Sequence, residues 1–255
     1  MKIRIKFAKY GSMKFIGHLD VMRFFQKAIR RADIDIKYSA GFSPHQIMSF
    51  AAPLGVGIES TGEYLDIEVN SITSPLEMKD ALNKVMVEGM EILAVTVLPD
   101  DSKNAMASVA AAEYRITCHL YNTGESSDDN ITIDDLKKKL SDFYQSEHIF
   151  VTKTTKKSVL ELDLKPGIYS LDILSPQEIS VFADASFIIT MFVNASSSGN
   201  IKPSMVLDAF CAYAQISLSS SYQIMRVDTY TNLAKEGEEP RFVPLHWKKS
   251  DINLL

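Results

Sequence analysis

The stretch that decides the fold runs from Lys9 to Glu63 and reads KYGSMKFIGHLDVMRFFQKAIRRADIDIKYSAGFSPHQIMSFAAPLGVGIESTGE. It contains a basic amphipathic helix, followed at once by a loop rich in Gly, Pro, Ser, Tyr and His. Loops carried on a rigid scaffold are where binding and catalytic residues concentrate. The stretch therefore locates a candidate site better than it identifies what the site does.

The segments around this stretch predict an α+β domain. Alternating or apolar runs predict strands over 2–9, near 34–38, near 47–51, and over 64–69 and 91–98. Helical spacing predicts helices over 19–32 and from Ser74 to about Gly89, the second opened by Ser74, Pro75 and Glu77 as capping signals. The order β-α-β-β-α-β over residues 1–98 is typical of the ferredoxin-like fold.

The second half of the chain repeats this order. We predict strands over 113–121, 149–153, 160–164, 186–193 and 221–230, and helices over 132–144 and 203–214. The fold class is then two tandem ferredoxin-like units with antiparallel sheets, the second with an insertion between its middle strands. The domains are 1–98, a linker over 99–112, a second domain over 113–231, and a polar tail over 232–255.

Composition indicates a soluble globular protein. The chain has 255 residues, of which 46% are hydrophobic and 23% charged. Cys118 and Cys211 lie in apolar segments, which favours buried thiols and a reducing compartment. No run of about 18 apolar residues and no signal peptide are present. We therefore expect a cytoplasmic protein without a membrane span.

Charge is distributed unevenly along the chain. Residues 1–50 contain ten Lys and Arg against three Asp, although the formal net charge of the whole chain is −5. The excess indicates an anionic partner for the basic part, or simple neutralisation across the fold. At 100° per residue, Arg23, Lys27, Arg30 and Arg31 share an arc of about 100° opposite the apolar stripe. Such a face can hold phosphates, or can simply be a solvated helix surface.

The loop over 38–49 reads YSAGFSPHQIMS. Gly41 permits a left-handed turn, and Pro44 stiffens the backbone after Ser43. Phe42 and His45 are suited to stacking on a ligand or hydrogen-bonding to it. The predicted binding residues of the whole stretch are Asp20, Arg23, Lys27, Arg30, Arg31, Tyr38, Ser39, Phe42, Ser43, His45, Glu59 and Glu63.

His18 and His45 are the candidate catalytic residues. If both face one cleft, they can act as acid and base, because the ordinary pKa of histidine lies near neutrality. Two histidines are too few for a closed metal site, and the spacing of Asp20, Glu59 and Glu63 is not diagnostic of a mixed one. The alternative, which we favour, is that His18 caps the helix and His45 bonds a backbone group. We predict no metal and no cofactor.

Lys2, Arg4 and Lys6 form a second group of cations, which we attribute to structure. In a ferredoxin-like sheet the first and third strands are neighbours, so Asp66 and Glu68 would face these cations. The P-loop, dinucleotide, zinc-protease, nucleophile-elbow and C-x-x-C motifs are all absent from the sequence.

The same stretch resembles the radical-SAM-linked proteins, a bacterial family of unknown function. The resemblance is carried by FIGHLDVMR over 15–23, AIRRA over 28–32 and YSAGFSPH over 38–45, with further matches at 49–51, 53–54, 57, 59–60 and 63–64. It is specific over residues 9–68 and weaker beyond, with Arg226 as a late match. Gly17 and Ser43 depart from the family, which more often has Ser and Asn there.

The resemblance implies an accessory role beside a cobalamin-type radical SAM protein, on RNA or a ribosome-related substrate. The chain has no cysteine triad for an iron–sulfur cluster, so it is not itself the radical enzyme. Our first hypothesis is a non-catalytic substrate-binding module. The alternatives are an RNA-processing or RNA-modifying enzyme that uses His18 and His45, and a protein–protein interaction module.

Overall fold

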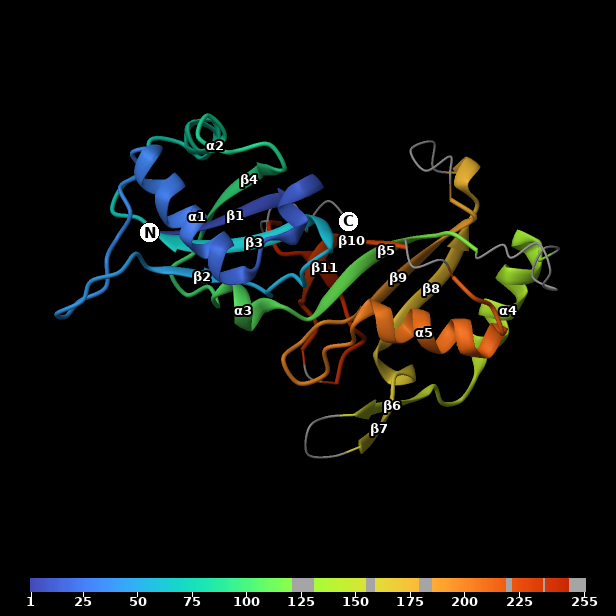
Figure 1. The fold of residues 1–255 in the computed structure, drawn as a ribbon. Coiled ribbons are helices and arrows are strands. Elements are labelled where there is room, and N and C mark those ends of the chain that lie inside the picture. Colours follow the sequence, from blue (N-terminus) through green and yellow to red (C-terminus); the bar gives the residue numbers. More distant parts are fainter. Residues whose placement is uncertain (121–130, 155–158, 179–184, 219–221, 236, 248–255) are drawn as a thin grey trace. The chain divides into compact units, whose positions relative to one another are not determined.

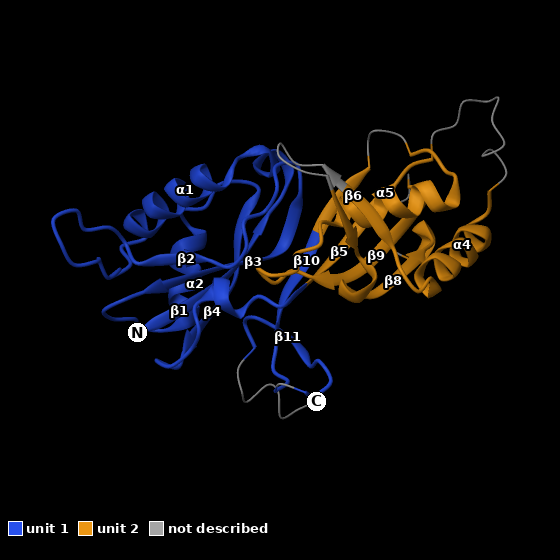
Figure 2. Cartoon of the chain, turned by 90° about the horizontal axis from the view of Figure 1, so that it is seen from below, with its two compact units in different colours: residues 1–111, 226–255 blue, residues 112–225 orange. Residues whose placement is uncertain are grey.

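The computed structural model describes residues 1–120, 131–154, 159–178, 185–218, 222–235 and 237–247. They fall into two compact units, residues 1–111 with 226–255, and residues 112–225 (Figure 2). Both are built from helices and antiparallel strand pairs, which agrees with the predicted α+β class. The segment 226–231, assigned to the second domain from sequence, groups by contact with the first unit.

Unit 1 begins with the predicted element order β-α-β-β-α-β and ends with strands from the C-terminal part of the chain (Figure 1). Its elements are β1 (Lys2–Lys9), η1 (Gly11–Phe15), α1 (His18–Arg31), β2 (Met48–Phe50), β3 (Glu59–Glu68), α2 (Pro75–Asn83), β4 (Met90–Leu98), α3 (Ala105–Ser108), most of β10 (Gln223–Asn232) and β11 (Phe242–Pro244). The strand order is β4-β1-β3-β10, with β2 also on β3 and β11 on β10.

The core of unit 1 lies between one face of this sheet and helices α1 and α2. Ile3, Ile5 and Phe7 alternate along β1 toward the helices, as the period of two predicts. α1 presents Val21, Phe25 and Ile29 at four-residue spacing to the same core. This packing leaves the opposite side of α1 to solvent, which is what positions the candidate site.

Unit 2 has its own core and its own strand order, β5-β9-β8. Its elements are β5 (Ala111–Cys118), α4 (Ile133–Gln145), β6 (Phe150–Thr154), β7 (Val159–Asp163), η3 (Lys165–Gly167), β8 (Ile168–Leu174), η4 (Pro176–Glu178), β9 (Phe187–Asn194) and α5 (Pro203–Ala214). Ser186, predicted to begin a strand, lies one residue before β9. Residues 121 and 221, the outer ends of two predicted strands, lie outside the described residues.

Two predictions in unit 1 were wrong. Residues 34–38 form no strand. Ile36 pairs with Val69, whereas Tyr38 pairs with Gln46, so the segment makes two isolated bridges and no continuous ladder. α2 ends at Asn83 rather than Gly89. The Asn83 side chain bonds both backbone groups of Ile92, so residues 84–89 turn back toward β4.

In the middle of unit 2, the two predicted strands are confirmed, but their expected place in the ferredoxin-like sheet was wrong. The segments near 149–153 and 160–164 pair with each other as the hairpin β6–β7 and do not join the larger sheet. The strand that does pair with β9 is β8, which was not predicted from the sequence. Its burial alternates only partly, because the register with β9 shifts between Ile168 and Ser170, so Ile168 and Ile173 are both buried although they are five residues apart.

The described part of the segment after β10 packs against unit 1. Phe242–Pro244 adds β11 to the edge of β10, and Leu245 N donates to Thr229 O at 3.1 Å. Among the helices that the structure describes, none has both the length and the apolar character that crossing a membrane requires.

Candidate functional site

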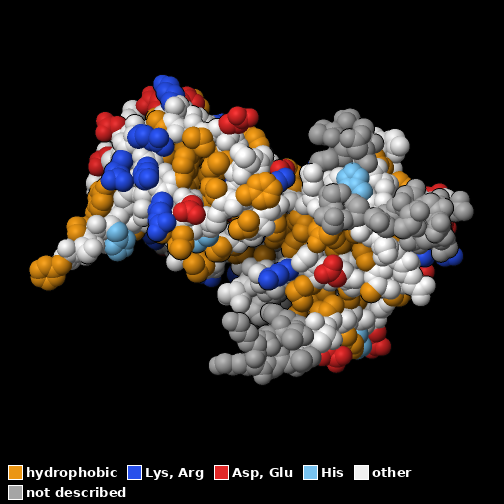
Figure 3. All heavy atoms as spheres, viewed as in Figure 1, with side chains coloured by type: hydrophobic (Ala, Val, Ile, Leu, Met, Phe, Trp, Pro, Cys, Tyr) orange, Lys and Arg blue, Asp and Glu red, His pale blue; other side chains and the backbone are white. Residues whose placement is uncertain are grey.

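The solvent side of α1 carries the four predicted cations, Arg23, Lys27, Arg30 and Arg31, and all four are exposed. We call this surface the basic face. Figure 3 shows blue side chains gathered over α1, beside the loop that leads to β2. Arg23 contacts Asp20 at 3.3 Å, but these side chains are 67% and 64% exposed, so the pair contributes little. Within the described residues, Lys27 and Arg31 have no carboxylate partner.

The loop over 38–46 projects away from the body of unit 1 (Figure 1). Its neck is closed by backbone pairing: Ser39 N donates to His45 O at 2.9 Å, and Ile47 N donates to Lys37 O at 2.9 Å. Gly41 at the tip has φ of +109°, a conformation that favours glycine. Phe42 beside it is fully exposed, and Tyr38 at the neck is 47% exposed.

A single carbonyl group joins the basic face to the loop. The oxygen of Gln26 accepts from Arg30 Nε at 3.2 Å and from Gln46 Nε2 at 3.3 Å. Gln46 is buried, so this contact anchors the neck of the loop against α1. Neither Gln26 nor Gln46 was predicted to belong to the site, since polar residues at a loop boundary carry no signal of what they bond.

His45 is exposed and belongs to the loop neck. Its Nδ1 lies 2.9 Å from Ser39 Oγ, and its backbone N donates to the same oxygen at 3.1 Å. The prediction that its ring bonds a backbone group was therefore wrong, because the ring partner is a side chain. Ser43 lies exposed at the tip.

His18 lies in a different setting, at the first turn of α1. It does not cap the helix as predicted, since the N-cap is Gly17 and the helix start has no side-chain cap. Its ring instead packs edge-on against Phe50, with centroids 5.1 Å apart. His18 lines a cavity of about 10 Å³, room for roughly one water. His45 is not among the residues that line it.

Three charged side chains lie buried beside this small cavity. Glu63 Oε1 accepts from Arg226 Nη1 at 3.0 Å, and the side chains are only 7% and 8% exposed. Lys9, which lines the cavity with Glu63, donates to Ile16 O at 3.0 Å. Burial lowers the pKa of the Lys9 amine, while the Glu63 carboxylate acts in the opposite direction. Glu63 is thus part of a buried ion pair and is not exposed to a ligand.

The burial of Lys9 follows from its place in the alternation of β1. Lys2, Arg4 and Lys6 lie on one face of the strand, whereas Lys9 follows Ile3, Ile5 and Phe7 on the face toward the helices. The β1–β3 register shifts between Phe7 and Lys9, and the extra residue of this shift lies in β3. The sequence signal that could have indicated a buried cation is a lysine at a position where the alternation calls for an apolar residue.

The remaining predicted acidic residues, Glu59 and Asp20, each face a cation of unit 1 itself. Glu59 accepts from Lys14 Nζ at 3.1 Å and from Gly11 N at 3.2 Å, which fastens η1 to β3. Asp20 pairs with Arg23 as described. In the part of the chain that the structure describes, no three His, Cys, Asp or Glu residues are grouped as metal ligands.

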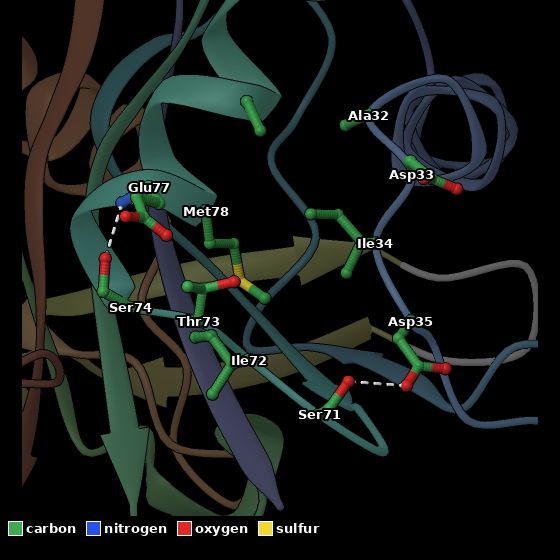
Figure 4. A pocket seen from close by; sticks show the side chains of 11 residues that line it. Ala32, Asp33, Ile34, Asp35, Ser71, Ile72, Thr73, Ser74, Glu77 and Met78 are labelled. Atoms are coloured by element: carbon green, nitrogen blue, oxygen red, sulfur yellow. Dashed lines mark hydrogen bonds between the residues drawn. The ribbon is translucent and has the colours of Figure 1, made fainter.

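A larger pocket lies at the other end of α1, and its chemistry differs from that of the basic face. It has a volume of about 210 Å³, and its lining includes Asp33, Asp35 and Glu77 (Figure 4). Hydrogen bonds from Asn70 and Ser71 lower the pKa of Asp35. These carboxylates would repel an anionic ligand, so this pocket is separate from the candidate site.

The cations of the open sheet face are engaged, which agrees with their structural interpretation. The predicted role of Glu68 was wrong, because Glu68 pairs with Lys37, and Lys2 bonds backbone oxygens instead. Arg4 holds Asp66 through two bonds of 2.8 Å each. Lys6 pairs with Asp228 of β10 at 2.6 Å, a partner that sequence could not indicate. These two cations of β1 are therefore committed to internal carboxylates, unlike Lys27 and Arg31 of α1.

Comparisons with known proteins give a family and no function. A family model described as an uncharacterized protein conserved in bacteria (DUF2344) matches residues 2–203. The match includes α1, the 38–46 loop and β3. A search of the curated proteins found no match.

Proposed function

The chain belongs to the family of uncharacterized proteins conserved in bacteria (DUF2344), and we propose that it is a binding module acting with a radical SAM partner on RNA or a ribosome-related substrate. The family description states neither an activity nor a partner. The radical SAM partner comes from the resemblance of residues 9–68, and the anionic substrate comes from the charges of unit 1. We further propose that the protein acts in the cytoplasm and has no catalytic activity of its own.

The RNA proposal rests on one observation: the basic face of α1 and the 38–46 loop are both exposed and are linked by hydrogen bonds. The basic face holds four cations on one side of a rigid helix, and only Arg23 faces a carboxylate among the described residues. The 38–46 loop, which follows α1, carries Phe42 at its tip, and this ring packs against nothing in unit 1. Gln26 and Gln46 hold the two in a fixed relation.

This arrangement suits a single strand better than a duplex. Lysine and arginine side chains hold phosphates and release counterions, which supplies affinity without sequence preference. An exposed aromatic ring can stack on a base only if that base is already unstacked. Phe42 and Tyr38 would therefore contact bases while the basic face contacts the backbone.

The test is the affinity of a labelled single-stranded RNA, measured by fluorescence anisotropy over a range of salt concentrations. Lys27→Glu combined with Arg31→Glu reverses two charges that have no carboxylate partner within the described residues. We expect affinity to fall roughly tenfold or more, and the slope of log affinity against log salt to become shallower by about 1.4.

The matched control is Lys79→Glu combined with Lys84→Glu on α2 of the same unit. It changes the net charge of the chain by the same amount, and we expect it to leave RNA affinity within about twofold. RNA affinity that falls equally in both double variants would reflect net charge alone. Equal affinity of the basic-face variant and the wild type would refute the proposed surface.

A second candidate, a protein-docking surface, is favoured by the apolar side chains near the start of α1. Phe15, Leu19 and Val56 are 65%, 61% and 63% exposed. Lys14 O accepts from Gly57 N at 2.9 Å, which keeps the loop of Val56 beside η1. Exposed apolar residues of this kind often mark protein contacts. We propose that the radical SAM partner docks here.

A pull-down from the native bacterial host separates these roles. The wild-type chain should retain a radical SAM protein, identified by mass spectrometry, and Phe15→Asp with Leu19→Asp should lose it while still binding RNA. Retention by that variant argues against the docking site. Cleavage or modification of the RNA by the purified protein, abolished by His18→Ala or His45→Ala, would support the enzyme alternative instead.

We also infer that the chain is a tandem duplication of the ferredoxin-like unit. The order β4-β1-β3-β2 in unit 1 supports this, since it places the first and third strands at the centre. In unit 2, if the separate hairpin β6–β7 is left out of the count, the order β5-β9-β8 likewise places the first strand beside the third.

A further inference from the structure

The open face of the unit 1 sheet, on the side away from α1 and α2, contains a larger cavity. Its volume is about 470 Å³, within the range of small-molecule sites. Its walls come from β1, β4, the segment 99–103, α3, β10, β11 and Trp247. A site of this size admits a small organic molecule, and it is remote from the basic face in the fold of unit 1.

The walls of this cavity are fastened to the sheet. Lys2 Nζ donates to the carbonyl oxygens of Asp100 and Ser102 at 2.7 and 3.0 Å. Arg4 donates to Lys103 O at 3.3 Å and to Leu245 O at 3.2 Å. One guanidinium group therefore bonds the backbone of both segments that border the cavity. The site is therefore formed before a ligand arrives, which lowers the entropic cost of binding.

The lining is mostly apolar. The apolar residues that line the cavity are Val97, Leu98, Pro99, Leu233, Val243, Pro244, Leu245 and Trp247. An aliphatic and indole lining of this kind favours a ligand with an apolar ring or chain.

Charge in the lining has one sign. Its ionisable residues are Arg4 and Lys103, and no carboxylate is among them. Asp66 neutralises Arg4. The Lys103 amine has no partner within the described residues, and Lys103 is exposed at the rim. The cavity thus combines an apolar interior with one available cation.

We propose that this cavity binds a small amphipathic organic anion, with its apolar body against Trp247 and Leu98 and its carboxylate, sulfonate or phosphate group at Lys103. A purely apolar ligand would leave the cation unused, and a cationic one would meet Lys103 unfavourably. The proposal is independent of RNA binding, because none of its residues lies on the basic face or in the 38–46 loop.

The test uses the single tryptophan of the chain as its reporter. Because Trp247 lines the cavity, titration with anilinonaphthalene sulfonate, an apolar ring system with one sulfonate, should change its emission. We expect a saturable change with one dye bound. Near-ultraviolet circular dichroism, recorded in parallel, should show that the protein keeps its native packing.

Lys103→Glu should weaken dye binding roughly tenfold, since it replaces an attraction with a repulsion. Its matched control, Lys84→Glu at the end of α2, should bind as the wild type does. Leu98→Phe, at a half-buried position opposite Lys2 on the open face, should narrow the cavity and weaken dye binding without loss of folding. Each cavity variant should keep its RNA affinity.

Three outcomes would overturn the proposal. They are dye binding with no response from Trp247, equal affinity in Lys103→Glu and Lys84→Glu, and undiminished binding in a folded Leu98→Phe. An uncharged naphthalene that binds as tightly as the sulfonate would remove the anionic half of the proposal in the same experiment.

Discussion

The Glu63 carboxylate accepts a hydrogen bond from Arg226, and both side chains are less than 10% exposed. The charge of Glu63 also acts to raise the pKa of the Lys9 amine. Two cations thus depend on one carboxylate beside a cavity that holds roughly one water. A buried ion pair is weak evidence of net stability, but loss of one partner is costly because the other stays charged and dry. The role of Glu63, in the middle of β3, is therefore structural.

Glu63→Gln should lower the free energy of unfolding by about 3 kcal/mol, because Arg226 and Lys9 lose their counter-charge. Urea denaturation followed by Trp247 emission measures this in unit 1. The control is Glu59→Gln, whose pair with Lys14 is 20–24% exposed and should cost no more than about 1 kcal/mol. Equal losses in the two variants would contradict a buried role for Glu63.

Phe42→Ala should leave stability unchanged within about 0.5 kcal/mol, because the ring buries nothing against unit 1. Its effect should appear in binding. Loss of one stacked base would weaken single-stranded RNA binding by about 1–3 kcal/mol. Anisotropy with single-stranded and duplex RNA of the same sequence measures both. A loss that is the same for the two RNAs would argue against stacking.

At the scale of elements, the helices follow local signals closely. α4 begins at a capping box, where Thr132 Oγ1 accepts from Asp135 N at 3.1 Å and Asp135 Oδ2 accepts from Thr132 N at 3.1 Å. Bonds from the Thr132 side chain and backbone lower the pKa of Asp135. The carboxylate therefore stabilises the folded state at neutral pH.

Thr132→Ala should destabilise unit 2 by about 1 kcal/mol at neutral pH, since an N-cap is lost. The pKa of Asp135 in the folded state lies below its ordinary value of 3.8. The stability it contributes is thus present above that value and disappears as pH falls through the lowered pKa. The cost of Asp135→Asn, measured by urea denaturation followed by circular dichroism, should shrink toward acid pH. A cost independent of pH would exclude the carboxylate as its source.

At the scale of the whole molecule, unit 1 is discontinuous in sequence. β10 supplies Arg226 to Glu63 and Asp228 to Lys6 and Tyr64, although these residues are more than 160 positions apart. Gly62 allows the close approach of the two backbones, because a Cβ there would lie 2.2 Å from Asp228 Cα. The N-terminal half of the fold thus depends on the C-terminal part of the chain.

A fragment of residues 1–111 should therefore fail to fold alone. Without β10, the buried Glu63 and Tyr64 lose their partners and β3 gains an unpaired edge. Two-dimensional amide NMR should show collapsed dispersion for the fragment and native dispersion for the full chain. A fragment with native-like dispersion and cooperative unfolding would show that β10 is dispensable.

The sequence by itself determined the features that depend on near neighbours. The apolar stripe and the basic face of α1 follow from a period of 3.6, and the caps at Ser74 and Thr132 from residues three apart. β1 was predicted at its observed bounds, because its alternation is a local property. The left-handed turn expected at Gly41 is likewise present, with φ of +109°.

Only the tertiary structure decided which polar side chains are buried and what they bond. Glu63 and Glu59 look alike in sequence, yet Arg226, 163 positions away, makes one of them part of the core. The Gln46 side chain bonds the backbone oxygen of Gln26, and β8 pairs with β9. Trp247 lines the same cavity as Arg4, near the other end of the chain. The physical reason is that burial and pairing are set by chain segments distant in sequence, whose approach no local pattern encodes.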